Sequence, residues 1–269
     1  MGNGQRYEVI AHNTATTSTN KIHDDEVARR YGFGGGLVPG VDVYAYMTHV
    51  PAEAWGRDWL ARGSMRARFL SPVYEGDVLT VVPGEPGEVG GGPCVPLEVR
   101  NEAGTTCAVG HAGLPAEPGP PPDVAAVPGV ARAERPDADP ASLTRGTVLA
   151  VAPELWEAAG AGPYLADVRE DLALYPAERA AHPAWVLRRA NDVLGSNVRL
   201  GPWIHVESDV RHHAVVADGD SVDTRATVTR EWQHKGHRFV ALDVGVFASG
   251  RLAARIVHTA IYRPRPVSA

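Results

Sequence analysis

The second half of the chain repeats a short pattern found in the first half, and this repeat constrains the fold more than any other feature. Arg68 and Gly76 have the same separation as Arg211 and Gly219, and an aspartate follows each glycine. Such self-similarity is the signature of a structural unit that is used more than once in a chain. We therefore expect two units of similar architecture.

Each unit combines one long helix with a meander of strands. Segments 97–114 and 242–261 both have the pattern of strand, glycine turn and strand, because apolar or alternating runs flank residues that favour tight turns. Ahead of the strands, residues 41–55 and 182–197 place apolar side chains at helical spacing. The expected fold is α+β, with two tandem antiparallel sheets that each wrap around a long central helix.

Composition marks the boundary between the two units. Residues 116–143 are rich in Pro, Ala and Gly, which is typical of a linker rather than of a packed element. We predict a first domain at residues 1–115, a linker at 116–143 and a second domain at 144–269. A chain of 269 residues is long enough for two domains of ordinary size.

Charge and hydropathy exclude several classes of protein. The formal net charge of -6 comes without a basic stripe, so nucleic acid is not an expected partner. No apolar run is long enough to cross a bilayer, and we therefore expect a cytoplasmic protein with no membrane partner. Cys94 and Cys107 lack CxxC spacing and a nearby His pair, so neither a disulfide framework nor a metal site is expected.

The most specific motif lies between residues 20 and 40. The sequence NKIH at 20–23 is followed by Asp25, by a Gly-Phe-Gly-Gly run at 32–35, and by Gly40 directly before the first predicted helix. Segment 68–79, RFLSPVYEGDVL, adds an Arg-Phe strand and a Gly-Asp turn. Together these motifs resemble the MaoC-like family of R-specific enoyl-CoA hydratases. The resemblance implies the double hot-dog architecture.

The resemblance also implies roles for individual residues. His23 would be the central acid and base, with Asn20 as a positioning residue, and the backbone N–H at Gly40 would bind the thioester carbonyl. Ser18 stands where the family has its catalytic aspartate, so the acid of the family is replaced. Asp25 is a candidate to compensate for it or, in the simpler interpretation, to cap the short helix that follows. The remaining candidate substrate-binding residues are Gly36, Val38 and Tyr44.

The function that the resemblance implies is hydration of an acyl thioester, or the reverse dehydration, on CoA or a carrier protein. Because the aspartate is replaced, the alternatives are a hot-dog thioesterase, a cyclase that acts on a tethered chain, and a non-catalytic subunit that binds acyl groups or stabilises a partner. No cofactor is expected apart from the CoA or phosphopantetheine that carries the substrate, and an acyl carrier protein is a candidate partner. A duplicated chain supplies both halves of the usual dimer, so a pseudo-dimeric monomer or a homodimer is expected.

Two further histidines, His205 and His49, lie outside this stretch. On the strand predicted after residue 201, Trp203, His205, Glu207 and Asp209 alternate onto one face, which is costly in a dry core. That face is either solvated, which we favour, or lines a polar pocket between the halves. His49 is expected to end its helix, where the helix dipole favours a cation.

Overall fold

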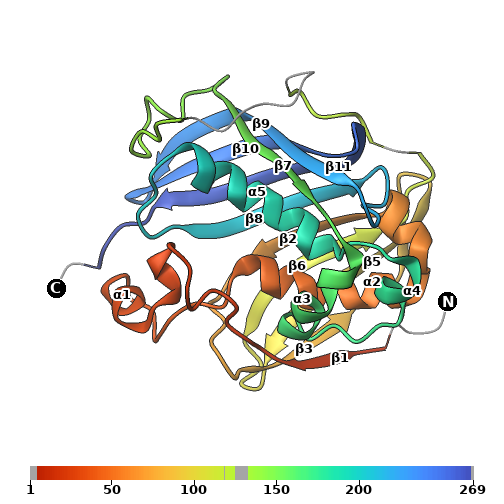
Figure 1. Ribbon diagram of the computed structural model, residues 1–269. Helices are drawn as coiled ribbons and strands as arrows, with labels where there is room; N and C mark the ends of the chain where they lie inside the picture. Colours follow the sequence, from red (N-terminus) through yellow and green to blue (C-terminus); the bar gives the residue numbers. More distant parts are fainter. Residues whose placement is uncertain (1–4, 118, 125–132, 268–269) are drawn as a thin grey trace.

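The computed structural model describes residues 5–117, 119–124 and 133–267, and it shows helices packed against an extended antiparallel sheet (Figure 1). The strands are β1 (Tyr7–Ile10), β2 (Ser64–Phe69), β3 (Val78–Pro83), β4 (Gly87–Val89), β5 (Gly92–Asn101), β6 (Thr106–Gly113), β7 (Val148–Leu155), β8 (Ile204–His212), β9 (Ser221–His234), β10 (His237–Ala248) and β11 (Arg251–Arg263). The helices are α1 (Asp25–Arg30), α2 (Gly40–Arg62), α3 (Ala161–Asp167), α4 (Leu174–Glu178) and α5 (Pro183–Asn197). Two short 3-10 turns lie at Lys21–His23 and Ala158–Gly160.

The described strands form one sheet, and this corrects the expectation of two separate sheets. Their order is β1-β3-β5-β6-β2-β8-β11-β10-β9-β7, with β4 added beside β5. The two halves meet where β2 pairs with β8, from Ser64 opposite Arg211 to Arg68 opposite Glu207. An unpaired strand edge leaves backbone N–H and C=O groups without partners, so this pairing satisfies the inner edges of both halves at once.

One long helix lies against each half of the sheet. Helix α5 crosses the strands of the second half, whereas α2 lies beside the strands of the first (Figure 1). Side chains of α2 are buried without interruption from Val41 to Ala52, so this helix is enclosed on all sides along its first turns. Most of the buried apolar side chains described in the two halves belong to a single core cluster.

Helix α2 is longer than the predicted segment 41–55. The chain continues in helical conformation to Arg62, after a break at Gly56, where φ is 55° and ψ is −139°. A glycine can adopt this conformation and thereby kink the helix without ending it. The second predicted helix, 182–197, agrees with α5, and His182 forms its N-cap by accepting a hydrogen bond from the Ala184 N–H.

The described part of the predicted linker contains neither a helix nor a strand. It still contacts the second half. Asp137 forms an isolated β-bridge with Arg199, and the Asp123 N–H donates to the carboxylate of Asp243 at 3.0 Å. Residues 118 and 125–132 of the linker, together with 1–4 and 268–269 of the predicted domains, lie outside the described residues. The domain limits therefore stay a prediction. Among the described helices, none has the length and apolar character needed to cross a membrane.

Candidate active site

A mostly apolar cavity of about 280 Å³ lies where the loop at 20–40 meets β8. Its walls come from both halves of the chain. The lining residues are Asn20, His23, Phe33, Leu37, Val38, Pro39, Gly40, Val43, Phe69, Leu70, Ser71, Pro72, Val73, Cys107, Trp203, Ile204, His205, Val206, His237 and Ile261. None of these residues carries a carboxylate, so histidine supplies the titratable nitrogens of this cavity.

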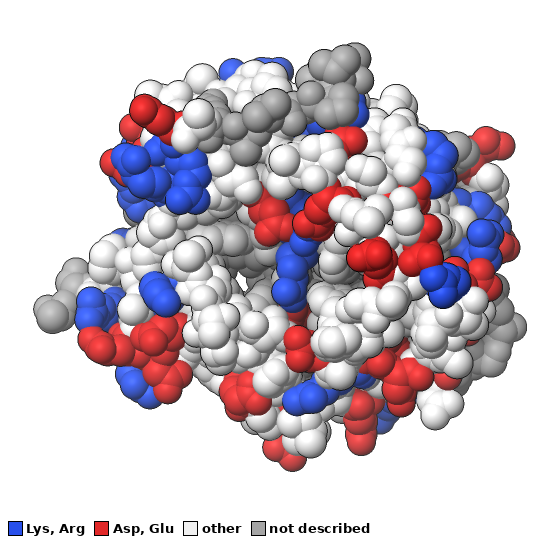
Figure 2. Space-filling model, viewed as in Figure 1, with Lys and Arg blue, Asp and Glu red and all other residues white. Residues whose placement is uncertain are grey.

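Charged side chains are interspersed over the face of the molecule in Figure 2, with a gathering of Lys and Arg near the ends of β9 and β10. The turn between these strands is Lys235-Gly236, where both residues have positive φ, and His237 follows it. His237 also lines the cavity. The hairpin therefore brings an exposed cation close to one side of the site.

His23 is held in one tautomer by the backbone. Its Nδ1–H donates to the Leu37 carbonyl oxygen at 2.7 Å, because a carbonyl can only accept. The other nitrogen, Nε2, then carries the lone pair and accepts from the Asn20 amide at 3.2 Å. Burial lowers the pKa of His23, against the opposing effect of the Leu37 hydrogen bond, and Arg188 lowers it further. The ring is thus a neutral imidazole whose base nitrogen is known.

Asn20 joins the loop of the first half to the start of β8 in the second. Its Oδ1 accepts from the Trp203 N–H at 3.0 Å, and its Nδ2–H donates to the Trp203 carbonyl at 3.0 Å. The Ile22 N–H also donates to Oδ1. These backbone partners fix which end of the amide is oxygen, so the group that faces His23 is the donor.

Gly36 and Val38 form the wall of the loop behind His23. A Cβ at Gly36 would lie 2.1 Å from the His23 carbonyl oxygen, so this close approach requires glycine. The Val38 N–H donates to the Val73 carbonyl at 2.8 Å, and Val38 lines the cavity. Gly36 is therefore a packing residue of the loop, whereas Val38 faces the site.

The simpler interpretation, that Asp25 caps the helix that follows it, is wrong. The N-cap of α1 is Asp24, whose carboxylate accepts from the backbone N–H groups of the first turn. Asp25 instead accepts from the Gly36 N–H at 2.8 Å and holds the glycine loop in place. Asp25 lies outside the residues that line the cavity.

Gly40 begins α2 and lines the cavity. The Pro39 carbonyl accepts from Asp42 and Val43, but the N–H groups of Gly40 and Val41 have no acceptor within the described part of the chain. The first N–H groups of a helix point along its axis and carry its positive dipole end. This end of the cavity can therefore bind an oxygen that carries partial negative charge.

Ser18 and Tyr44 lie away from the cavity. The Ser18 hydroxyl oxygen accepts from the Asn20 N–H at 3.1 Å, and this contact supports the turn that leads to His23. Tyr44 is fully buried, and its hydroxyl has no hydrogen-bond partner among the described residues. Neither side chain is among those that line the cavity.

His205 lines the wall of the cavity that β8 contributes. From the sequence, its face of the strand was either solvated or part of a polar pocket. A β-bulge separates it from Glu207: Ala260 pairs with His205, and the next residue, Thr259, pairs with Glu207. The bulge breaks the expected alternation, so His205 turns inward while Glu207 forms an ion pair with Arg66, with 2.6 Å between Arg66 Nε and Glu207 Oε1. The predicted single face is thus divided between the cavity and the surface.

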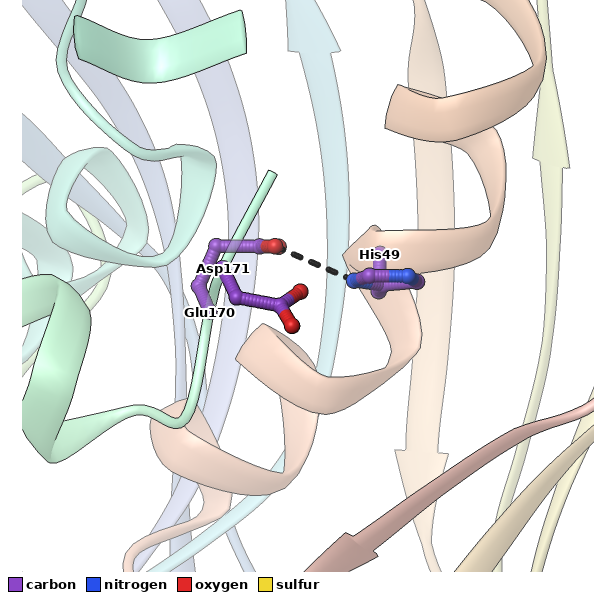
Figure 3. Close-up of side chains that lie close together, drawn as sticks. All are labelled: His49, Glu170 and Asp171. Atoms are coloured by element: carbon purple, nitrogen blue, oxygen red, sulfur yellow. Dashed lines mark hydrogen bonds and ion pairs between the residues drawn. The ribbon is translucent and has the colours of Figure 1, made fainter. Parts of the chain in front are cut away.

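A second polar cluster lies beside α2, where His49, Glu170 and Asp171 approach one another (Figure 3). The His49 Nδ1–H donates to Glu170 at 3.0 Å, and the rings of His49 and Tyr7 stack at 3.8 Å. Burial lowers the pKa of His49, but the hydrogen bond and charge of Glu170 outweigh it and raise the pKa overall. His49 therefore lies within α2 and ties it to the second half, instead of ending the helix.

The amino-acid sequence matches no family model, and it matches no curated protein. Solved structures do resemble the fold. A double hot-dog protein from Mycobacterium tuberculosis is 17% identical, with a TM-score of 0.62 over 97% of this chain and 96% of that one. A MaoC-like dehydratase is 13% identical, with a TM-score of 0.60 over 97% and 98% of the two chains.

Proteins assigned as thioesterases have a similar fold. One from Thermobifida fusca, a thioesterase II, is 16% identical, with a TM-score of 0.54 over 95% of this chain and 91% of that one. At such identities the likeness concerns the path of the chain and not its chemistry. The fold expected from the motifs is confirmed: this chain has the double hot-dog fold, which it shares with MaoC-like dehydratases of known structure.

Proposed function

We propose that this protein is a hydratase or dehydratase that acts on an acyl thioester. The observation that carries the proposal is the position of His23. Its ring is neutral, its Nδ1–H is committed to the Leu37 carbonyl, and its Nε2 lone pair lies at an apolar cavity that ends at the N-terminus of α2. A base, an apolar space and backbone donors are the parts that addition of water to a 2-enoyl thioester requires.

In the hydration direction, a water molecule at His23 Nε2 loses a proton to that nitrogen as its oxygen attacks C3 of the 2-enoyl thioester. The C2–C3 π electrons move toward the carbonyl, and the thioester oxygen gains enolate charge. The free N–H groups of Gly40 and Val41 stabilise that charge. His23 then returns the proton to C2, so that H and OH have been added and the imidazole is neutral again.

The proposed water enters between His23 Nε2 and Asn20 Nδ2, so that the ring accepts from the water and the amide N–H donates to the water oxygen. In the structure these two nitrogens are 3.2 Å apart, the separation of a long hydrogen bond that opens to admit the water. Asn20 keeps its two bonds to Trp203 and so remains in place to orient the water. This is the positioning role expected for Asn20.

The cavity and its surroundings also suit the carrier end of the substrate. Apolar side chains line most of the cavity, which favours a short acyl group. Lys235 is exposed and has no partner in the described structure, and it lies in the turn next to the cavity residue His237. The phosphate of CoA, or of a carrier protein's phosphopantetheine arm, is the anion that we assign to this side.

The test follows crotonyl-CoA hydration by loss of enoyl absorbance, with free thiol measured in the same cuvette. We expect the wild type to hydrate crotonyl-CoA. The rate of hydration should fall about 10²–10⁴-fold in His23→Gln, which is the usual rate contribution of a general base. Ser18→Ala should retain activity within a few-fold, because Ser18 lies outside the cavity.

Two other results would contradict the proposal. Release of thiol that depends on His23, without hydration, would identify a thioesterase. If neither reaction occurs in the wild type but Ser18→Asp gains hydration, the fold is intact and its chemistry has been lost, which favours a binding subunit or a cyclase.

A further inference from the structure

Three buried polar side chains form a hydrogen-bonded triad that leads from the cavity into the sheet. The ring of His205 lies 2.8 Å from the Ser208 hydroxyl through Nε2, and the same hydroxyl lies 3.0 Å from His258 Nδ1. Ser208 and His258 face each other across β8 and β11, and both are completely buried. The bulge after His205 is what places residues 205 and 208 on one face of β8.

One nitrogen at each end of this triad has no hydrogen-bond partner among the described residues. His258 Nε2 is enclosed in the core, whereas His205 Nδ1 belongs to a ring that lines the cavity. His205 is 7% exposed, and its unpartnered nitrogen is a buried polar atom beside Gly40, at the edge of the cavity. Buried polar atoms ordinarily have partners, which indicates that a bound molecule supplies this one.

This hydrogen-bonded triad has two possible proton arrangements, because the single Ser208 hydroxyl proton can point to either ring. If His205 Nε2 carries a proton, His258 accepts from Ser208 and must hold its own proton on Nε2, where the core offers no acceptor. If His258 Nδ1–H donates to Ser208 and Ser208 donates to His205, the lone pair of His258 Nε2 is unpaired in the core and the unpaired donor is His205 Nδ1–H, on a ring that lines the cavity. An unsatisfied buried donor is costly, and of the two rings only His205 lies where a bound molecule can supply the acceptor.

Two groups near His205 act on its ring in opposite directions. The Glu207 carbonyl favours a proton on the ring of His205, but burial and His258 lower the pKa of His205 well below its usual range, so the ring is neutral. The carbonyl forms no hydrogen bond with the ring among the bonds of the described residues, whereas the bond to Ser208 is short at 2.8 Å. The second arrangement therefore prevails, and His205 presents Nδ1–H to the cavity.

A donor at this nitrogen lies next to the free end of α2. A Cβ built on Gly40 would be 3.0 Å from His205 Nδ1 and 3.1 Å from the ring of Phe69. The ring of Phe69 packs edge-on against His205 at 4.7 Å and fixes its plane. The imidazole N–H of the second half and the backbone N–H groups of the first thus converge on the same small volume.

We propose that His205 Nδ1–H and the Gly40 N–H together bind the thioester oxygen and stabilise its enolate charge, with Ser208 and His258 as positioning residues. The proposal rests on the function proposed above and deepens it. It gives the two cavity imidazoles opposite roles: His23 accepts a proton, whereas His205 donates a hydrogen bond without transferring its proton. In this arrangement each half of the chain contributes one part of a single site.

The experiment combines two readouts on the wild type, His205→Phe and Ser208→Ala. The first is crotonyl-CoA hydration. The second is binding of acetoacetyl-CoA, whose enolate absorbs in the near ultraviolet, so that stabilisation of the enolate is seen without turnover. We expect His205→Phe to lose about 10²–10³-fold in kcat, the effect of removing one such donor, and to lose the enolate absorbance of the bound ligand. Ser208→Ala should show a smaller loss of both.

Nitrogen-15 NMR of the wild type adds a readout that a merely structural role would not move. We expect the neutral His205 ring to carry its proton on Nδ1, and the Ser208→Ala variant to lose this preference. The control is His111→Gln, which changes an exposed histidine on β6 outside the cavity and should leave all readouts unchanged. If His205→Phe does not fold, the wild-type tautomer and Ser208→Ala decide the question.

The outcomes separate this proposal from the proposed function. Hydration that depends on His23 but is unchanged in His205→Phe, or a wild-type proton on Nε2 of His205, would overturn the role of His205 alone. Absence of hydration with an enolate signal that depends on His205 would overturn the proposed reaction and support the oxygen-binding site.

Discussion

At the scale of single residues, Gly40 lies where the start of α2 comes close to His205 of the opposite wall of the cavity. We predict that Gly40→Ala lowers kcat/KM for the acyl thioester by about 10²-fold, because the new methyl group enters the space between His205 and Phe69 and displaces the substrate oxygen. Stability should also fall, by about 1–3 kcal/mol, because the methyl group lies within 3.1 Å of both rings and forces them to shift. Steady-state kinetics and urea unfolding measure both effects.

The control for this substitution is Gly201→Ala. Gly201 lies shortly before β8, and a Cβ there would meet no atom within 4 Å. This variant should keep wild-type kinetics. Equal activity of Gly40→Ala and the wild type would show that the substrate oxygen binds elsewhere.

The residues of the site differ in how far the sequence could predict them. His23, Asn20 and Gly40 belong to a local motif, and the structure brings all three to one cavity. His205 could not be placed, because strand alternation puts it on a face with Glu207, and only the bulge in β8 separates them. A bulge depends on how two strands pair, and a single strand's sequence does not encode it.

At the scale of elements, the kink in α2 depends on the backbone conformation of Gly56. Gly56 has φ of 55° and ψ of −139°, a region that residues with a side chain rarely adopt, although a Cβ there would meet no neighbour. We predict that Gly56→Ala lowers the free energy of unfolding by about 1–3 kcal/mol through backbone strain alone. Urea unfolding with a tryptophan signal measures this change.

A matched substitution isolates the backbone contribution. Gly195 lies in α5 and also has free space around its Cα, but its φ is not positive. Gly195→Ala should therefore raise the free energy of unfolding, by up to about 1 kcal/mol. Destabilisation of the same size in both variants would mean that positive φ at Gly56 is not the cause.

The elements themselves were largely predictable, since helical spacing and strand alternation are local properties. The limits of α2 were not, because the helical spacing predicted only residues 41–55 and the continuation beyond Gly56 depends on packing. Trp59, in the last turns of α2, is fully buried. The pairing of β2 with β8 likewise follows from the docking of the two halves, which no local pattern records.

At the scale of the whole molecule, polar pairs join the two halves around the apolar core. Asp42 of α2 is completely buried and accepts from Arg188 of α5 at 2.7 Å. Glu170 pairs with His49, and hydrogen bonds from the histidines beside it outweigh burial and lower its pKa to about 2. These contacts hold the two halves of one chain together, and whether that chain is a pseudo-dimeric monomer or a homodimer stays a prediction. Light scattering at several protein concentrations tests that state.

Buried histidines also make the stability of the whole fold depend on pH. Burial lowers the pKa of His258 to about 3 and, with a smaller effect of His213, that of His212 to about 4. In the unfolded chain a histidine titrates near pH 6.5, so between that value and the folded pKa the unfolded state binds more protons. The stabilisation is therefore complete above about pH 6.5 and is lost as pH falls toward the folded values.

We predict that the free energy of unfolding falls between pH 6.5 and 4.5 by about 1.4 kcal/mol per pH unit for each such histidine. His49 opposes this trend, because its raised pKa stabilises the protonated fold, and Glu170 contributes only below about pH 4.5. Urea unfolding at several pH values measures the slope. His212→Leu, which lies away from the cavity, should reduce the slope by the contribution of one histidine, whereas replacement of the exposed His234 by Gln should not. A free energy of unfolding that stays constant over this range would show that water reaches these rings in the folded protein.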